Sequence, residues 1–404
     1  MRVLQVNKFF YVRGGSERYY FDLCDLLRER GHSVSQFSMK HGRNLPAPDQ
    51  SYFVSEIDLN ACATPAARAR AAFRILYSWE AKAAIGRLMD SCRPDLVHCH
   101  NISRQLSPSI LDAAHSRGIP IVETMHDLFL VCPAHSFFVN GAPCEACKSG
   151  AFWHATRLRC IDGSTASSVL GTAEAYLHAW ARLYRKISLF IAPSLFLKSK
   201  VDSLGWTKDR TVHLPYFVPL GPDYSARNDG YALFAGRVSR EKGVGVLLDA
   251  ASMCRAVDFV IAGEGPELGD YRRAAARLGL ANVRFVGYVK GEALEKLLAG
   301  ARCVVVPSLS YENLPLSILE AFARGKPAVA ADSGGIAELV KDDTTGYLFE
   351  RGVSASLADA IERMASDDRR RERMGRNARQ MIATDYSPAA HYQRLMGIYE
   401  SVLK

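Results

Sequence analysis

Two cationic side chains stand within one glycine-bounded segment in the second half of the chain. The segment runs from Gly236 to Gly243 and contains Arg237 and Lys242. It lies between a strand-like run and a helix-like run, where glycines let the backbone pass close to a ligand and a helix start offers unpaired N–H groups. This chemistry favours a phosphate or diphosphate ligand. A solvated basic loop is the alternative, because glycine-rich patterns alone are weakly specific.

Two carboxylates are spaced along a second segment, which follows another strand-like run. Glu312 and Glu320 are eight residues apart. If Pro315 occupies the first position of the following helix, the backbone around it exposes N–H groups to a ligand. Glu320 then lies deeper in the helix, where it can contact a ribose rather than a phosphate. A third strand-like run ends in the donor-rich turn 332–335. Three such strand ends in one half favour a binding site over three unrelated loops.

The second half resembles the donor domain of family 4 glycosyltransferases, retaining enzymes with the GT-B fold. The resemblance implies that Arg237 and Lys242 hold the donor diphosphate. It also implies that Glu312 faces the donor sugar and the reaction centre, and that Glu320 binds the ribose hydroxyls. Asn313 stands where many members carry glycine. We expect the loop shape to survive, because asparagine tolerates a left-handed backbone.

The same resemblance extends the expected donor site. The short strand end at Gly287 and Tyr288 resembles the family's site for the nucleotide base, with weaker specificity. The full set expected to contact the donor comprises Gly14, Gly15, Gly236, Arg237, Lys242, Gly287, Tyr288, Glu312, Asn313, Leu314, Pro315, Leu316 and Glu320.

The first half contributes a glycine loop and a histidine. The loop 13–17 feeds a helix and resembles the family's N-terminal glycine loop, whose amides approach the donor phosphate. A plain turn between strand and helix is the alternative. His126 follows a strand-like stretch, and the resemblance implies that its backbone carbonyl steadies positive charge at the anomeric carbon, although a lone histidine is usually structural. The expected catalytic set is His126, Glu312, Arg237 and Lys242. Candidates for acceptor contact are His98, His100 and Asn101, of which one histidine can belong to the core.

Strand-like and helix-like runs alternate along both halves, which predicts parallel sheets flanked by helices. Prolines, glycines and polar residues interrupt this alternation at 215–230, which we interpret as an interdomain linker. The predicted fold is α/β of the GT-B type, with two Rossmann-like doubly wound domains and an interdomain cleft. Its parts are an N-terminal acceptor-binding domain (1–214) with a cysteine-rich insertion (132–160), the linker, a C-terminal nucleotide-sugar donor-binding domain (231–385) and a helix that crosses back to the first domain (386–404).

The composition is that of a globular protein, with 48% hydrophobic and 23% charged residues among 404. No apolar run reaches the roughly 18 residues that span a bilayer, and the N-terminal run lacks the features of a signal peptide. We therefore expect a cytoplasmic protein. The net charge of +9 favours anionic partners. The arginine-rich run 369–379 is interpreted as a solvated helix face, so no nucleic-acid partner is expected.

The ten cysteines fall into two groups. Four of them include a Cys-x-x-Cys pair and could supply four thiolates to a structural zinc ion, which would leave no open position for catalysis. Disulfides, an iron–sulfur cluster and four unrelated thiols are the other interpretations. The clustered residues are Cys132, Cys144, Cys147 and Cys160. Six scattered residues suit small core positions: Cys24, Cys62, Cys92, Cys99, Cys254 and Cys303.

Residues 66–93 combine six basic side chains with interleaved apolar ones. As a helix, this segment would be basic and amphipathic, which suits an anionic membrane surface. A surface helix packed on its own sheet is the alternative, because Phe73, Leu76 and Tyr77 suit a core stripe. Since many related enzymes glycosylate lipid-linked carriers, we keep peripheral association with the cytoplasmic face of the inner membrane as a hypothesis.

The resemblance implies a retaining hexosyltransferase that moves a sugar from a UDP- or GDP-sugar to a glycan or polyprenyl-linked acceptor in cell-surface polysaccharide biosynthesis. The chain has no Asp-x-Asp motif, which metal-dependent GT-A transferases usually need, so no catalytic cofactor is expected. A nucleotide-sugar epimerase with the GT-B fold and a non-catalytic sugar-nucleotide-binding protein are the alternatives. The presence of Glu312 and His126 favours an enzyme over the non-catalytic binding protein.

Overall fold

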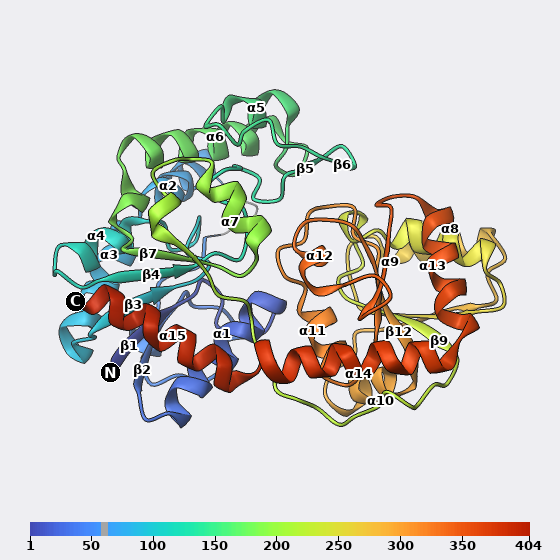
Figure 1. Ribbon diagram of the computed structural model, residues 1–404. Coiled ribbons are helices and arrows are strands. Elements are labelled where there is room, and N and C mark those ends of the chain that lie inside the picture. Colours follow the sequence, from blue (N-terminus) through green and yellow to red (C-terminus); the bar gives the residue numbers. More distant parts are fainter. Residues whose placement is uncertain (58–63) are drawn as a thin grey trace. The chain divides into compact units, whose positions relative to one another are not determined.

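The computed structural model describes residues 1–57 and 64–404. Packing divides the chain into two compact units. Unit 1 comprises Met1–Phe137, Glu145–Leu214 and Tyr392–Lys404, and unit 2 comprises Phe138–Cys144 and Pro215–His391. Each unit is built on its own six-stranded sheet with helices packed against it (Figure 1).

The sheet of unit 1 is parallel and has the order β2-β1-β3-β4-β7-β8. Its strands are β1 (Arg2–Val6), β2 (Ser33–Phe37), β3 (Leu96–Cys99), β4 (Ile121–Thr124), β7 (Leu189–Ala192) and β8 (Thr211–His213). The central strands β3 and β4 are buried along their whole length, as parallel strands covered by helices usually are. The helices are α1 (Gly15–Glu29), α2 (Pro65–Leu76), α3 (Trp79–Cys92), α4 (Ser109–His115), α5 (Trp153–Leu158), α6 (Thr165–Trp180) and α7 (Leu195–Asp202), with short 3-10 turns η1 (Gln50–Tyr52), η2 (Leu183–Lys186) and η3 (Lys208–Arg210).

The sheet of unit 2 is also parallel and has the order β11-β10-β9-β12-β13-β14. Its strands are β9 (Tyr231–Ala235), β10 (Asp258–Ala262), β11 (Val283–Gly287), β12 (Ala301–Val306), β13 (Ala328–Ala331) and β14 (Gly346–Phe349). The helices are α8 (Val244–Met253), α9 (Leu268–Arg277), α10 (Glu292–Gly300), α11 (Leu316–Phe322), α12 (Ile336–Leu339), α13 (Ser354–Ser366) and α14 (Asp368–Asp385), and η4 (Arg240–Lys242) precedes α8. A hairpin of β5 (Phe138–Val139) and β6 (Ala142–Pro143) groups with this unit.

The predicted α/β class with two doubly wound sheets is confirmed. In both sheets the strand order reverses beside the first strand of the unit. The next strand in the chain lies on one side of it (β2 beside β1, β10 beside β9), and a later strand lies on the other side (β3 and β12). Ligands of open α/β sheets bind where the order reverses, outside the carboxyl ends of the strands. A ligand site is therefore expected at the residues that follow β9 and β12.

The segment 215–230, interpreted as a linker, lies within unit 2 and is hydrogen-bonded to it. The N–H of Tyr224 donates to the carbonyl of Arg324 (2.9 Å), and that of Asp229 donates to Gly300 (2.8 Å). Hydrogen bonds thus attach this segment to the rest of unit 2.

The last helix, α15 (Pro388–Leu403), ends in unit 1. Figure 1 shows it beside β1 and β3. The Tyr392 hydroxyl lies 2.8 Å from Nε2 of His32, and the Tyr399 hydroxyl lies 2.7 Å from Nδ1 of His98 on β3. Two tyrosines therefore attach the end of the chain to the first sheet.

The basic segment 66–93 is not one helix, which corrects the sequence interpretation. Ser78 interrupts it, and its side chain accepts the Ala81 N–H at the start of α3 (3.1 Å), so α2 and α3 are separate helices. Phe73, expected in a core stripe, is 70% exposed, whereas Ile75 is buried. No helix in the described part of the chain is both long and apolar enough to cross a membrane.

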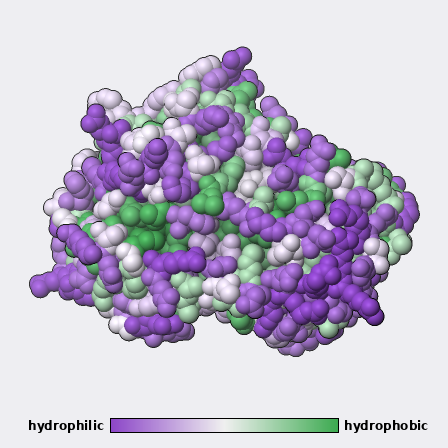
Figure 2. Space-filling view, viewed as in Figure 1, coloured by the Kyte–Doolittle hydropathy of each residue, from purple (hydrophilic) through white to green (hydrophobic). Residues whose placement is uncertain are grey.

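The arginine-rich run 369–379 lies on α14, whose surface is strongly hydrophilic in Figure 2. Arg371 is the exception, because it is buried and donates to the carbonyl of Ser225 (2.9 Å). Among the scattered cysteines, Cys62 lies outside the described residues. Cys92 is half-buried, and the buried ones are Cys24, Cys99, Cys254 and Cys303.

Candidate active site

The segment Gly236–Gly243 follows β9 directly and leads through η4 into α8. Gly243 has a φ of 73°, and a Cβ at this position would lie 1.8 Å from the carbonyl oxygen of Pro307, the residue after β12. Glycine is therefore required where the loops after β9 and β12 touch. Arg237 is exposed, and its guanidinium has no partner among the residues that the structure describes. It is available to an anion.

Lys242 and Glu312 form the central ion pair of unit 2. Nζ of Lys242 lies 2.7 Å from Oε1 of Glu312, and the Ser308 hydroxyl donates to the same oxygen (2.5 Å). The side chain of Glu312 is only 11% exposed, whereas that of Lys242 is 34% exposed. Burial raises the pKa of Glu312, but the charge of Lys242 and the two hydrogen bonds outweigh burial and lower that pKa below its ordinary value. The carboxylate is therefore ionised and oriented.

The backbone of Glu312 is held by the loop after β13. Glu312 forms a parallel bridge with Gly334, and the N–H of Gly335 donates to the Glu312 carbonyl (2.8 Å). The Ser333 hydroxyl donates to the carbonyl of Ser310 (3.0 Å). Loops that follow β9, β12 and β13 are thus joined at one edge of the sheet, although they are far apart in the sequence.

The remaining predicted residues of unit 2 lie on α11, on β11 and in the loops beside them. Pro315 precedes the first residue of α11 rather than occupying it, which corrects the predicted helix start by one position. Glu320 lies within α11. Its charge helps to raise the pKa of Arg324, although the effect of Glu295 on that pKa is larger. Asn313, Leu316 and Gly236 are at least partly accessible, and Leu314 is buried. Gly287 is the last residue of β11, and Tyr288, which follows it, is 60% exposed.

A second glycine loop, missed by the sequence analysis, packs against the first. A Cβ on Gly263 would lie 1.8 Å from the carbonyl oxygen of Gly236, and one on Gly265 would lie 2.0 Å from that of Val238. The sequence Gly263-Glu264-Gly265 after β10 was the available signal. Ser308 was also missed, because a lone serine after a strand carries no signal of its own.

The glycine loop of unit 1 is followed directly by a buried carboxylate, that of Glu17. Gly14 is the N-cap residue of α1 and Gly15 is its first residue. Glu17, in the first turn, is buried and accepts the Ser16 hydroxyl (3.1 Å). An acidic side chain at this helix end is favoured by the helix dipole. Any ligand phosphate near Gly14 and Gly15 would therefore need a cation beside it.

Lys8, which sequence reasoning missed, lies close enough to Glu17 for that carboxylate's charge to act on it. Burial lowers its pKa, and the charges of Asp127 and Glu17 act in the opposite direction. Asp127 has its pKa depressed to about 2: burial raises the pKa, but the charge and hydrogen bond of His135, Lys8 and the N–H of Phe129 outweigh it. Nδ1 of His135 lies 3.2 Å from Oδ2 of Asp127. Lys8, Glu17 and Asp127 thus form a charged cluster next to His126.

His126 is positioned by a second histidine. Its Nε2 lies 3.0 Å from Nδ1 of His100, whose Nε2 lies 2.9 Å from Oε1 of Gln5. Burial lowers the pKa of His126 to about 3, with Asp127 raising it and Lys8 lowering it, so the imidazole is neutral at neutral pH. The ring is therefore held in a fixed orientation.

Two family models cover the chain. The model described as "Glycosyltransferase Family 4" matches residues 13–221, more than half of the chain, and the one described as "Glycosyl transferases group 1" matches residues 224–381. The chain belongs to glycosyltransferase family 4. Similar curated proteins include the alpha-D-kanosaminyltransferase of Streptomyces kanamyceticus, 36% identical over 175 residues, which are 42% of this chain and 45% of that protein. The alpha-maltose-1-phosphate synthase of Mycobacterium tuberculosis is 34% identical over 189 residues, 43% of this chain and 49% of that protein. The chain thus matches about half the length of these relatives.

Solved structures show that this family 4 protein has the GT-B fold. Sucrose-phosphate synthase from Thermosynechococcus elongatus matches with a TM-score of 0.73 at 18% identity, over 99% of this chain and 98% of that one. Anabaena Alr3699/HepE in complex with UDP-glucose matches with a TM-score of 0.69 at 20% identity, over 99% and 100% of the two chains. At such identities the likeness concerns the fold alone.

The histidines predicted to contact an acceptor have different surroundings in this family 4 protein. His98 lies on β3, is buried, and approaches Thr124 and Tyr399, at 2.8 Å and 2.7 Å. It is a core histidine that links β3, β4 and α15. His100 is buried as well, and its ring contacts that of His126. Asn101 is partly accessible and donates its backbone N–H to Oδ1 of Asn7 (3.3 Å).

The four clustered cysteines do not form a visible metal site. Within residues 1–57 and 64–404, no group of three or more His, Cys, Asp or Glu side chains is arranged to hold a metal ion. Cys144 belongs to the hairpin grouped with unit 2, whereas Cys147 and Cys160 pack in an apolar cluster with Phe152. The predicted zinc ion is therefore unsupported by this arrangement.

Proposed function

We propose that this family 4 protein is a retaining glycosyltransferase that moves a sugar from a nucleotide diphosphate-sugar to a glycan or lipid-linked acceptor. The observation that supports it best is the Lys242–Glu312 pair at the joined ends of β9 and β12. An ionised carboxylate and a lysine with donors to spare suit a substrate that carries both hydroxyl groups and a diphosphate.

The donor half of the reaction is assigned to unit 2. The Lys242 ammonium has three N–H donors, so it can contact a phosphate while one of them remains on Glu312. Arg237 supplies a second cation. As the bond between the anomeric carbon and the diphosphate breaks, both cations stabilise the developing negative charge, which is electrostatic preorganisation. Glu312 orients the sugar hydroxyls and Glu320 binds the ribose.

The acceptor half is assigned to unit 1. The acceptor hydroxyl attacks the anomeric carbon from the face that the diphosphate leaves, and its proton passes to the departing phosphate. The backbone carbonyl of His126 supports the positive charge at that carbon. The His100 contact keeps the His126 segment in place, and its neutral imidazole adds no repelling charge. The scheme requires no divalent ion.

Peripheral attachment to an anionic membrane is part of this proposal. Arg68 and Arg70 are exposed on α2, and Arg70 lies less than one turn before the exposed ring of Phe73. Basic side chains next to an exposed aromatic ring suit the interface of an anionic bilayer. Trp79, which begins α3, is also exposed. An acceptor anchored in the cytoplasmic leaflet would then be within reach.

A panel of nucleotide sugars tests the donor assignment. A ligand that binds only the folded protein raises its melting temperature, so one UDP- or GDP-sugar should stand out in a thermal-shift screen. The matching sugar is then supplied with glycan and polyprenyl phosphate acceptors, and the anomeric configuration of the product is read by NMR. Inversion, or no stabilisation by any member of the panel, would contradict the proposal.

Two alternatives give different products in the same assay. An epimerase releases an altered sugar without an acceptor, and a silent binding protein gives a thermal shift but no product. Acceptor-dependent release of the free nucleoside diphosphate distinguishes the transferase from both.

A further inference from the structure

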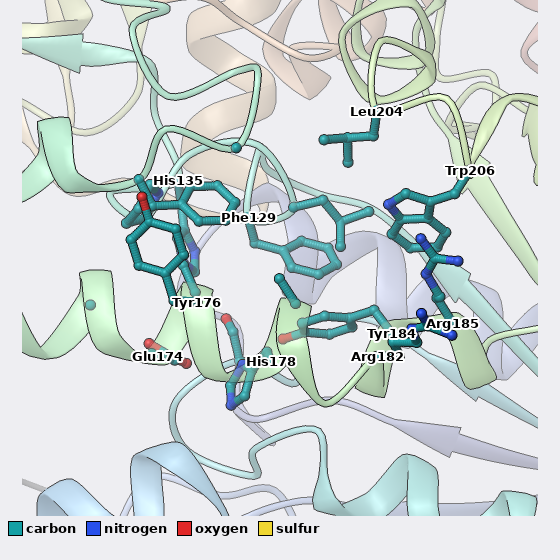
Figure 3. Close-up of a pocket in the computed structure, with 18 residues that line it drawn as sticks. Phe129, His135, Glu174, Tyr176, His178, Arg182, Tyr184, Arg185, Leu204 and Trp206 are labelled. Atoms are coloured by element: carbon teal, nitrogen blue, oxygen red, sulfur yellow. The ribbon is translucent and has the colours of Figure 1, made fainter.

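A cavity of about 340 Å³ lies within unit 1, behind α6. Figure 3 shows Phe129, Tyr184 and Trp206 lining one end of it, and Tyr176 and His135 the other. The Phe129 and Tyr184 rings are 5.0 Å apart, which makes the wall largely aromatic. The volume falls in the range of sites for small organic ligands, and the lining combines apolar walls with a few polar groups.

Charges in the cavity are distributed unequally. Its carboxylate, Glu174, is buried and lies 3.9 Å from Nε of Arg104, so that charge is already compensated. Arg182 and Arg185 stand at the rim and are exposed. Neither forms an ion pair with any residue in the described ranges; Arg185 lies over the Trp206 ring, 5.2 Å from its centroid. Two uncompensated cations beside an apolar cavity suit a ligand with a hydrocarbon part and an anionic group.

The cavity is next to the acceptor half of the proposed site. His135 lines it and is hydrogen-bonded to Asp127, which follows His126 directly in the chain. Phe129 and Leu130, also in the lining, continue the same segment. The end of the cavity that His135 lines therefore adjoins the His126 segment, whereas Arg185 stands at the other end beside Trp206 (Figure 3).

Helix α6 separates the cavity from an exposed apolar stripe. Glu174, Ala175 and His178 face the cavity, whereas Val169, Leu177 and Trp180 are exposed and do not line it. Helical periodicity places these three residues mainly on the opposite face of α6. Leu170 of α6 also packs against the core of α2, the helix with the exposed Phe73. Helix α6 thus lines the cavity and packs against α2, the helix that the function proposed above assigns to the membrane.

We propose that this cavity binds the hydrocarbon segment of a lipid-linked acceptor and that Arg182 and Arg185 bind the phosphate attached to that segment. This inference rests on the proposed function, because it names the acceptor class as a polyprenyl phosphate-type amphiphile. It assigns the specificity for the acceptor to residues outside the donor site.

Farnesyl phosphate is a suitable probe, with farnesol and inorganic phosphate as its uncharged and tail-free counterparts. Binding is followed by quenching of tryptophan fluorescence, because Trp206 lines the cavity. We expect farnesyl phosphate to bind at least about tenfold more tightly than either counterpart, since the two parts of the ligand contribute separately. Equal binding of farnesyl phosphate and inorganic phosphate overturns the proposal.

A matched pair of variants on α6 tests the location. Ala179 lines the cavity and Ala173 does not, although both are exposed. Ala179→Phe should weaken farnesyl phosphate binding at least tenfold, while Ala173→Phe leaves it unchanged. Leu204→Phe fills the cavity from another segment and covers the case in which Ala179→Phe fails to fold. Unchanged binding in both cavity variants overturns the proposal.

Substitution of both rim arginines tests the charge. The double variant Arg182→Gln, Arg185→Gln should bind farnesyl phosphate no better than farnesol, whereas Arg157→Gln on α5 should behave as wild type. The donor-induced thermal shift must be the same in all these variants. A protein that transfers sugar but ignores farnesyl phosphate overturns this inference alone. A protein that binds farnesyl phosphate in the cavity but no nucleotide sugar supports the cavity and overturns the proposed function.

Discussion

Nε2 of His126 lies 3.0 Å from Nδ1 of His100, so that two neutral imidazoles from the ends of adjacent strands share one hydrogen bond. Both pKa values are lowered, chiefly by burial, and that of His126 falls from 6.5 to about 3. Because the Gln5 oxygen can only accept, Nε2 of His100 carries its proton and Nδ1 accepts the hydrogen bond from His126. Protonation of His100 would break the contact, because both nitrogens in it would then carry a proton.

This pair predicts a loss of stability in acid. Between pH 6.5 and about 3 the unfolded chain binds protons that the folded His126 does not, so the free energy of unfolding falls as the pH is lowered through this window. We expect His126→Gln to reduce that dependence by up to about 2 kcal/mol, less than the full shift because the ring is partly accessible. Urea unfolding at several pH values measures it. Parallel curves for variant and wild type would contradict the prediction. The contribution of Asp127 is lost between pH 3.8 and about 2, so the comparison is made above pH 4, where His126 alone of the two contributes.

Lys242 and Glu312 should be essential for transfer but not for folding. We expect Lys242→Ala and Glu312→Ala each to reduce kcat/KM by roughly 100- to 1000-fold, the usual effect of losing one preorganised electrostatic contact. Lys296→Ala removes an exposed lysine paired with Glu292 on α10 and serves as the control. Circular dichroism should show folded protein throughout. Near-normal turnover in both variants would refute the assignment.

Because these two residues contact each other, their substitutions should not be additive. The double variant should lose little more activity than the more severe single variant. A loss equal to the product of the two single effects would show that the residues act independently.

Gly243→Ala should disrupt the junction of the loops after β9 and β12. The new Cβ would clash with the carbonyl oxygen of Pro307, and the left-handed backbone alone costs roughly 1–2 kcal/mol. Gly279→Ala is a matched control, since Gly279 also has a positive φ (60°) but nothing within 4 Å of its Cβ position. We expect Gly243→Ala to lower both melting temperature and donor affinity, whereas Gly279→Ala lowers only the melting temperature. Equal donor affinities would contradict the steric argument.

The α2 surface should contribute to membrane binding. Replacing Arg68 and Arg70 by Glu should weaken flotation with anionic vesicles by about tenfold or more, since each basic residue near the surface contributes about 1 kcal/mol. Arg369→Glu with Arg373→Glu changes the net charge equally on exposed positions of α14. This control should float like wild type, and equal loss in both would indicate a non-specific charge effect.

The sequence predicted the elements well where the signals are local. The glycine loops after β1 and β9 lie where expected, because a glycine turn between a strand and a helix is specified by adjacent residues. Short elements such as β8 and β14 were not identified. The break at Ser78 was also missed, although a serine before a helix start is a local signal.

What the sequence by itself determined is the α/β class, the family and the residue types for binding a diphosphate and a sugar. Only the tertiary structure decided that Lys242 meets Glu312, that Ser308 joins them and that Lys8 lies near Asp127. Such contacts depend on which strands are neighbours, and the order β9-β12-β13 is set by crossover connections and packing rather than by nearby residues. For the same reason the spacing of four cysteines did not decide whether their thiols converge.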